Sequence, residues 1–130
     1  MSINDHDSLT ARAEAGRAMA QQVLSGIDVR GIADWSDYQW MTMSQLFAEI
    51  WTLPELSMRD KRLLVLGVLA AVGKQEKFGI HLTSALRNGE FTAAQAREIP
   101  LLLVHYVGHP LGSDLPGVAE DAIRAAGVTG

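Results

Sequence analysis

Apolar residues recur at helical spacing along nearly the whole chain, and this spacing limits the fold more than any other feature of the sequence. No stretch alternates apolar and polar residues as a half-buried strand does, and no segment is repeated. Short segments that contain glycine, proline or capping residues separate the apolar stretches. The pattern therefore predicts one all-α domain over residues 1–130, a bundle of about six helices with flexible ends at about residues 1–7 and 127–130.

Local start and stop signals give the approximate limits of these helices. The predicted helices cover residues 8–25, 36 to just before Pro54, 57–72, 74–87, 92–107 and 115–126. Ser36 has capping-box spacing to Gln39, and Gly26 is expected to end the first helix. Residues 27–35 are then a connector. Pro100 is expected to kink or split the fifth helix, because proline removes a backbone hydrogen bond.

Two helices carry most of the large apolar side chains. The second helix is expected to place on one inner face Trp40, Met43, Phe47, Ile50 and Trp51. The helix over residues 57–72 is apolar nearly all round, which predicts a central position. Gly67, Ala70 and Ala71 in that helix are small enough to let a neighbouring helix approach closely.

Composition excludes several classes of function. The net charge of −4 and the pI near 5.5 argue against a nucleic-acid partner, which requires a basic surface. The longest apolar run, residues 63–72, is about half the length of a membrane span, and the first residues do not form a secretory signal. Cysteine is absent, so disulfides, thiolate nucleophiles and Cys-ligated metals are excluded. We therefore expect a cytoplasmic protein that acts on a small molecule.

His81 is the first candidate for chemistry. It lies on a helical stripe with Phe78, Leu82 and Ala85, so its ring faces apolar surroundings. Desolvation disfavours the charged imidazolium and can hold the ring neutral and ready to exchange a proton. From spacing alone, the commoner alternative is a core histidine satisfied by one hydrogen bond.

Three further charged residues are candidates with plain alternatives. Glu76 precedes His81 by five positions, about 140° of helical rotation, so the two do not share a helix face. Glu76 either reaches the same pocket from the first turn or between subunits, or is a carboxylate favoured by the helix dipole. Lys77 is one turn before His81 and either attracts an anionic substrate or is an exposed lysine. Glu49 is a candidate or a polar residue of an amphipathic helix.

His105 and His109 have the i, i+4 spacing of two metal ligands, and Asp114 follows them in the sequence. A catalytic zinc site needs three protein ligands, and no clear third ligand is present. The alternative is a pair of histidines near a helix C-terminus, where imidazolium is favoured by the dipole. We expect no metal here. The sequence also has no glycine-rich phosphate loop, so we expect no cofactor.

Residues 46–110 resemble the carboxymuconolactone decarboxylase family, which shares its all-helical fold with the AhpD alkylhydroperoxidases. The resembling positions are Glu49-Ile50-Trp51, Arg59-Asp60-Lys61, Glu76 with His81, Asn88-Gly89, and Tyr106 with Gly108 and Pro110. Weaker matches reach back to Arg12 and to Glu14-Ala15-Gly16. The resemblance implies an AhpD-like bundle and a homo-oligomer, a trimer or hexamer. The three tryptophans and five methionines also favour apolar subunit contacts.

The resemblance implies decarboxylation of 4-carboxymuconolactone to a 3-oxoadipate enol-lactone without a cofactor. Such a reaction needs a donor for the developing charge and an acid that protonates carbon. The family places its active-site histidine at His81, which makes His81 the proton donor and Glu76 or Glu49 the residue that orients it. The candidate substrate-binding residues are Arg59, Lys61, Lys77, Tyr106 and Trp51. Trp51 is also a candidate core or subunit-contact residue.

The chain also departs from the family pattern. In the peroxidase relatives a Cys-x-x-Cys motif precedes the matched histidine, whereas this chain has Lys74 and Lys77, so thiol-based peroxide reduction is excluded. Ala20, Gln21 and Leu53 stand where the family often has arginine. Loss of arginine disfavours a dicarboxylate substrate. The alternatives are therefore a decarboxylase for a less anionic lactone or carboxylic acid, or a non-catalytic member that binds a small molecule.

Overall fold

The structure is a computed structural model and describes residues 6–25 and 35–129. It divides into two compact units, Met1–Glu55 and Leu56–Gly130, each of which is described by itself. Every regular element among the described residues is helical, which confirms the all-α prediction. The predicted stop at Gly26 and the predicted connector up to residue 34 lie outside the described residues. None of the described helices is long and apolar enough to cross a membrane.

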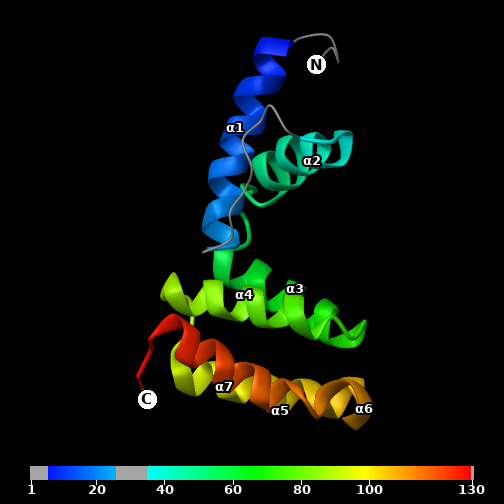
Figure 1. Cartoon of the computed structure of the whole chain (residues 1–130), viewed down its shortest axis with the longest axis vertical. Coiled ribbons are helices and arrows are strands. Elements are labelled where there is room, and N and C mark those ends of the chain that lie inside the picture. The colour runs from blue at the N-terminus through cyan, green and yellow to red at the C-terminus, as the bar shows by residue number, and fades with distance from the viewer. Residues whose placement is uncertain (1–5, 26–34, 130) are drawn as a thin grey trace. The chain divides into compact units, whose positions relative to one another are not determined.

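The first unit consists of α1 (His6–Val23), a short α2 (Asp37–Met41) and the π-helix η2 (Thr42–Ile50) that continues it (Figure 1). Ser36 caps α2 as predicted: its Oγ accepts the Gln39 N–H at 3.3 Å, and the Gln39 Oε1 accepts the Ser36 N–H at 2.8 Å. The change from α- to π-helical winding was not predicted. It is seen at the end of η2, where the Trp51 N–H donates to the Leu46 carbonyl at 2.9 Å.

The core of the first unit forms where α1 packs against η2. The buried residues are Ala13, Gly16, Ala20 and Val23 of α1, Met43 and Phe47 of η2, and Trp51. Phe47 and Trp51 stack with ring centroids 6.4 Å apart. The prediction that Ile50 shares this inner face is wrong, since Ile50 is 52% exposed. The π-helical winding has more residues per turn than an α-helix, so it rotates Ile50 out of the predicted register.

Gly16 sets how closely α1 approaches η2. A Cβ on Gly16 would lie 1.7 Å from the Met43 carbonyl oxygen, a contact that only a backbone movement can relieve. We expect Gly16→Ala to destabilise the protein by about 1–3 kcal/mol, as overpacking of a core does. Gly117→Ala is the matched control, because a Cβ there meets nothing within 4 Å and alanine favours a helix. Thermal unfolding should show a lower Tm for the first variant alone. Equal melting of both variants would contradict the close approach.

The second unit consists of α3 (Met58–Ala71), α4 (Gln75–Arg87), α5 (Ala93–Val107), the short α6 (His109–Gly112) and α7 (Leu115–Ala126). The helix α4 packs against both α3 and α7, and α5 packs against α7 and α6 (Figure 1). The buried core includes Leu66 and Ala70 of α3, Phe78, Leu82, Ala85 and Leu86 of α4, Phe91, Ala93 and Ala96 near the start of α5, and Leu115, Ala119, Ala122 and Ile123 of α7. Val128, in the predicted flexible end, also packs against this core.

Three details of the second unit differ from the predictions. Pro100 is buried inside α5, which runs unbroken from Ala93 to Val107, so of the two predicted effects the split is wrong. The short α6 was not predicted; it begins after Gly108, whose φ of +86° favours glycine. The predicted central position of α3 is wrong, because Leu64 and Val68 are 62% and 61% exposed. An apolar residue covered by another chain gives the same sequence pattern as one covered by its own chain.

Candidate functional site

Arg62 lies on the buried face of α3, one and two helical turns before Leu66 and Ala70. Its side chain is completely buried. A buried guanidinium is strongly destabilising unless a carboxylate and further hydrogen-bond acceptors surround it. The position of Arg62 therefore requires a polar site inside this unit.

Glu90 supplies the carboxylate. Its Oε1 accepts the Nε–H of Arg62 at 3.1 Å, and its Oε2 accepts an N–H of the second guanidinium nitrogen at 3.0 Å. This two-bond geometry is the strongest arrangement of an arginine with a carboxylate. The Asn88 amide also donates to Oε2, at 3.2 Å. The Glu90 side chain is only 8% exposed, so the pair is shielded from water.

The end of α4 fixes the position of Glu90. Gly89 adopts a φ of +73°, and its N–H donates to the Leu86 carbonyl at 3.1 Å. The N–H of Glu90 then donates to the Ala85 carbonyl at 2.9 Å, which completes a glycine C-cap of the Schellman type. The turn at Asn88-Gly89 that ends α4 therefore also places the Glu90 carboxylate against Arg62.

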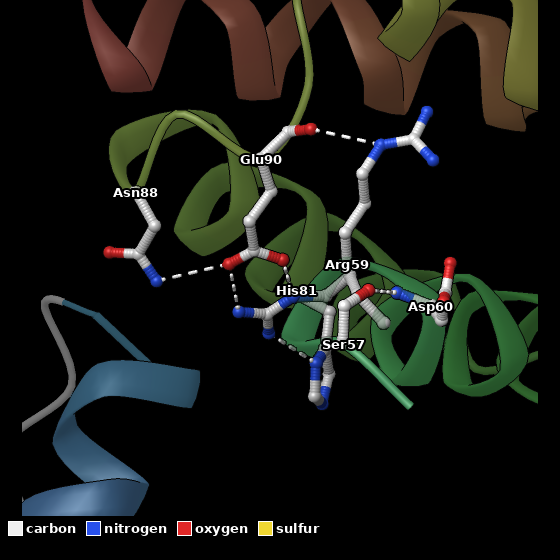
Figure 2. A network of polar contacts seen from close by, with 7 residues as sticks. Ser57, Arg59, Asp60, His81, Asn88 and Glu90 are labelled. Atoms are coloured by element: carbon white, nitrogen blue, oxygen red, sulfur yellow. Dashed lines mark hydrogen bonds and ion pairs between the residues drawn. The ribbon is translucent and has the colours of Figure 1, made fainter. Parts of the chain in front are cut away.

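Arg59 holds the same turn from the outside. Its Nε–H donates to the Glu90 carbonyl oxygen at 3.2 Å, and its guanidinium lies over the Phe91 ring, 5.1 Å from the centroid. Figure 2 shows Arg59, Asn88 and His81 gathered around Glu90, with the Ser57 cap of α3 beside them. The turn after α4 and the first turns of α3 thus form one polar cluster.

His81 joins this cluster from α4. Its Nδ1 lies 2.9 Å from the NH1 nitrogen of Arg62. A guanidinium has donors only, so Nδ1 must accept this hydrogen bond and carry no proton. The proton of the neutral ring is then on Nε2. In Figure 2 the ring of His81 extends away from Glu90.

Burial is the main reason why the His81 ring stays neutral. The pKa of His81 is lowered from 6.5 to about 4, first by burial and then by the positive charge of Arg62, while the negative charge of Glu90 raises it. The lowered pKa fits the expected neutral ring, but the surroundings are not purely apolar, because Nδ1 faces the buried guanidinium of Arg62. At neutral pH the ring is therefore uncharged imidazole with an N–H donor at Nε2.

This pKa makes stability depend on pH in a defined direction. Between about pH 6.5 and pH 4 the unfolded chain binds a proton at His81 that the folded chain does not bind. The stabilisation from neutral His81 is present above pH 6.5 and is lost as the pH falls toward 4. We expect the urea midpoint of the wild type to fall across this window, and that of His81→Asn to fall less. Equal losses in both proteins would show that His81 has no lowered pKa.

Most other predicted site residues of the second unit are exposed. Glu76 is exposed in the first turn of α4, and Lys77 is exposed one turn before His81. Lys61 is half-buried on α3. Tyr106 is 83% exposed near the end of α5. The hydrogen bond seen at Nδ1 of His81 thus comes from Arg62 and not from a predicted glutamate.

Glu49 and Trp51 belong to the first unit. Glu49 is half-exposed on η2 and forms an ion pair with Arg12 of α1. Trp51 is buried and stacks on Phe47, as its alternative interpretation as a core residue predicts. Arg12 and Glu49 thus link α1 to η2 within this unit.

His105 has a local role in α5. Its Nδ1–H donates to the Leu101 carbonyl at 2.7 Å, one turn earlier on the exposed side of the helix. His109 is also exposed, at the start of α6. Among the described residues no group of three or more histidine, aspartate and glutamate side chains is placed to hold a metal ion.

Sequence reasoning missed the roles of Arg62 and Glu90. The available signal for Arg62 was its register, since it shares the helix face of Leu66 and Ala70 and a charge on a buried face requires a partner. Glu90 gave a weaker signal, because a glutamate after a glycine C-cap usually lies in solvent. Its role depends on the packing of the turn against α3, and local sequence patterns do not predict such a contact.

Comparison with known proteins identifies the family. The model of the carboxymuconolactone decarboxylase family matches residues 36–121, a range that includes His81, Arg62 and Glu90. A 4-carboxymuconolactone decarboxylase from Acinetobacter baylyi is 26% identical over 92 residues, which cover 71% of this chain and 68% of the relative. No solved structure matches the chain. The family model covers well over half of the sequence, and the chain therefore belongs to the carboxymuconolactone decarboxylase family.

Proposed function

We propose that the protein is a cofactor-independent decarboxylase of a small lactone or carboxylic acid, with His81 as the proton donor. The observation that carries this proposal is the hydrogen bond between Arg62 and Nδ1 of a half-buried His81 in a member of this family. It leaves the ring neutral with its proton at Nε2. The relative from Acinetobacter baylyi supports the reaction class.

The reaction that we propose proceeds in two steps. The bond between carbon and the carboxylate breaks, CO2 leaves, and the electron pair passes into the conjugated lactone carbonyl as an enolate. The Nε2–H of His81 then transfers its proton to carbon, and a proton from water restores the ring. A neutral imidazole is suited to this task, because enolate chemistry uses an uncharged N–H donor where the negative charge develops.

Positive side chains near His81 support an anionic substrate. Lys77 lies one turn before His81 on the same face of α4 and is exposed. Arg59 is exposed, and its guanidinium lies over Phe91 while its Nε holds the turn at Glu90. We propose that Lys77 and Arg59, with Lys61, attract the substrate carboxylate. Glu76, Tyr106, Glu49 and Trp51 remain predicted contributors.

The substrate is proposed to be less anionic than a dicarboxylate. Ala20 is fully buried in the first unit, and Leu53 is exposed, at positions where the family often has arginine. Neither side chain can hold a carboxylate by two hydrogen bonds. These losses also favour the second candidate function, a non-catalytic member that binds a small molecule through the same fold.

CO2 release tests these two functions directly. The purified protein is first treated with a chelator to remove metal ions. It is then incubated with 4-carboxymuconolactone and with related lactones that carry one carboxylate. We expect catalytic CO2 release from at least one of these compounds. The rate should be highest for a lactone that carries a single carboxylate. Binding of a lactone without CO2 release would instead support the non-catalytic function. Activity that needs added zinc would contradict the cofactor-independent reaction.

We also propose that the protein is a homo-oligomer. Leu64, Val68 and Val72 give the second unit exposed apolar surface along α3, each about 60% exposed. Exposed apolar patches of this kind usually mark contacts with another chain. Light scattering at micromolar concentration should give a mass of at least twice 14.1 kDa, and Val68→Glu should lower it. A monomer in both cases would contradict the proposal.

A further inference from the structure

Three side chains from three parts of the second unit form a chain of hydrogen bonds that ends on His81. Glu90 in the turn after α4 holds Arg62 of α3 through two of the guanidinium nitrogens. The third guanidinium nitrogen, NH1, is 2.9 Å from Nδ1 of His81 on α4. Because a planar guanidinium fixes the directions of its N–H bonds, the carboxylate pair determines where NH1 points.

We propose that Arg62, held by Glu90, is a positioning residue that fixes His81 as the tautomer with its proton on Nε2. Nδ1 accepts from a group that cannot itself accept, so the ring cannot exchange tautomers while this contact persists. The orientation of the ring is fixed by the same bond. The tautomer is a property of the folded protein alone. Only the expected effect of Arg62 on turnover rests on the proposed function.

The proposed proton transfer gives Arg62 a second consequence. When Nε2 passes its proton to the enolate carbon, the ring becomes an imidazolate, and the new negative charge lies against the guanidinium. A buried positive group beside Nδ1 stabilises this anion in surroundings of low dielectric. Arg62 therefore makes neutral His81 a stronger acid without touching the substrate.

Other ion pairs in the described part of this unit lie on its surface. Arg62 and Glu90 both act on the pKa of His81. On the helices packed near α4, Arg97 of α5 pairs with Glu120 of α7, and Asp121 pairs with Arg124 on α7. The Arg97–Glu120 pair is also held by two hydrogen bonds, but its side chains are more than 40% exposed. It is therefore a matched control for the buried pair.

The wild-type protein allows the first test without any substitution. Long-range ¹H–¹⁵N NMR spectra of the imidazole nitrogens at pH 7 should show His81 as a single tautomer, with a protonated Nε2 and an unprotonated Nδ1. An Nδ1–H tautomer, or the averaged shifts of two tautomers in exchange, would overturn the proposal. Exposed His105 and His109 provide references in the same spectrum.

Two substitutions then separate positioning from general loosening of the site. Glu90→Gln removes the charge that raises the His81 pKa, so we expect the titration of His81 to move lower still while the tautomer stays fixed. Arg62→Lys keeps the positive charge but gives up the planar contact, so the His81 pKa should stay well below 6.5 while the two tautomers exchange. Arg97→Lys should change neither property. If both site variants moved the titration upward, the site would only have loosened, and the proposal would be wrong.

Turnover distinguishes this inference from the proposed function. On any substrate that releases CO2, Arg62→Lys should lower kcat by about 10- to 100-fold with little change in KM, as loss of a side chain that orients a histidine does. A fixed tautomer in a protein that decarboxylates nothing would end the proposed function and leave the positioning role intact. An unchanged tautomer and an unchanged kcat in Arg62→Lys would end the positioning role.

Discussion

His81→Asn is expected to lower kcat for CO2 release by about 10²–10⁴-fold, the usual contribution of a general acid, while the helical fold is kept. The Asn amide oxygen can stand where Nδ1 stands and accept the Arg62 N–H, so the buried guanidinium keeps its partner. Nothing in the variant replaces Nε2. Turnover and circular dichroism, measured on the same samples, check both halves of this result.

His81→Gln refines this prediction. The Gln amide can reach toward the position of Nε2 and donate a hydrogen bond, but an amide does not transfer its proton at a useful rate. If His81 transfers a proton, the Gln variant should be nearly as slow as the Asn variant. Substantial activity in His81→Gln would show that His81 only stabilises the enolate by hydrogen bonding. Full activity in His81→Asn would remove His81 from the reaction.

Arg62→Met is expected to cost about 3–5 kcal/mol of unfolding free energy, because it leaves the Glu90 carboxylate buried without its partner. Glu90→Leu should lower the unfolding free energy by a similar amount, because it leaves the buried Arg62 guanidinium without its carboxylate. The double variant, Arg62→Met with Glu90→Leu, should recover most of the loss, since a well-packed apolar pair can replace a buried ion pair. Urea unfolding of the four proteins gives this double-mutant cycle.

The exposed Arg97–Glu120 pair is the control for this cycle. Arg97→Met should leave the urea midpoint nearly unchanged, because an exposed pair is solvated whether or not it is paired. Additive losses in the Arg62 and Glu90 variants, with no recovery in the double variant, would contradict a direct buried interaction between them. For the double variant we therefore predict that stability recovers and that turnover does not.

Much of the fold follows from local patterns in the sequence. The first residues of three predicted helices, Ser36, Ser57 and Thr92, are the observed N-caps of α2, α3 and α5. These features are local, so spacing alone predicts them. The last helix was predicted over residues 115–126 and is observed as Leu115–Ala126. The same patterns could not predict the π-helical winding of η2, which depends on how the chain packs against α1.

The candidate site was only partly predictable for the same reason. His81 stands on an apolar stripe of one helix, which the sequence displays directly. Its contact to Arg62 joins two helices, and the contact of Arg62 to Glu90 joins a helix to a turn 28 positions further along the chain. Such contacts arise from packing between elements. The sequence shows only that a charged residue, Arg62, shares a helix face with apolar residues, and this pattern indicates that a buried polar site exists.

The pH dependence of kcat/KM for CO2 release tests most directly whether His81 acts in its uncharged form. With wild-type protein and a lactone acid that it turns over, we predict a constant value from about pH 8 down to about pH 5. The value should fall only as the pH approaches the His81 pKa of about 4. A loss of activity as the pH rises through 6.5 would mean that imidazolium is the working acid, and it would contradict this account.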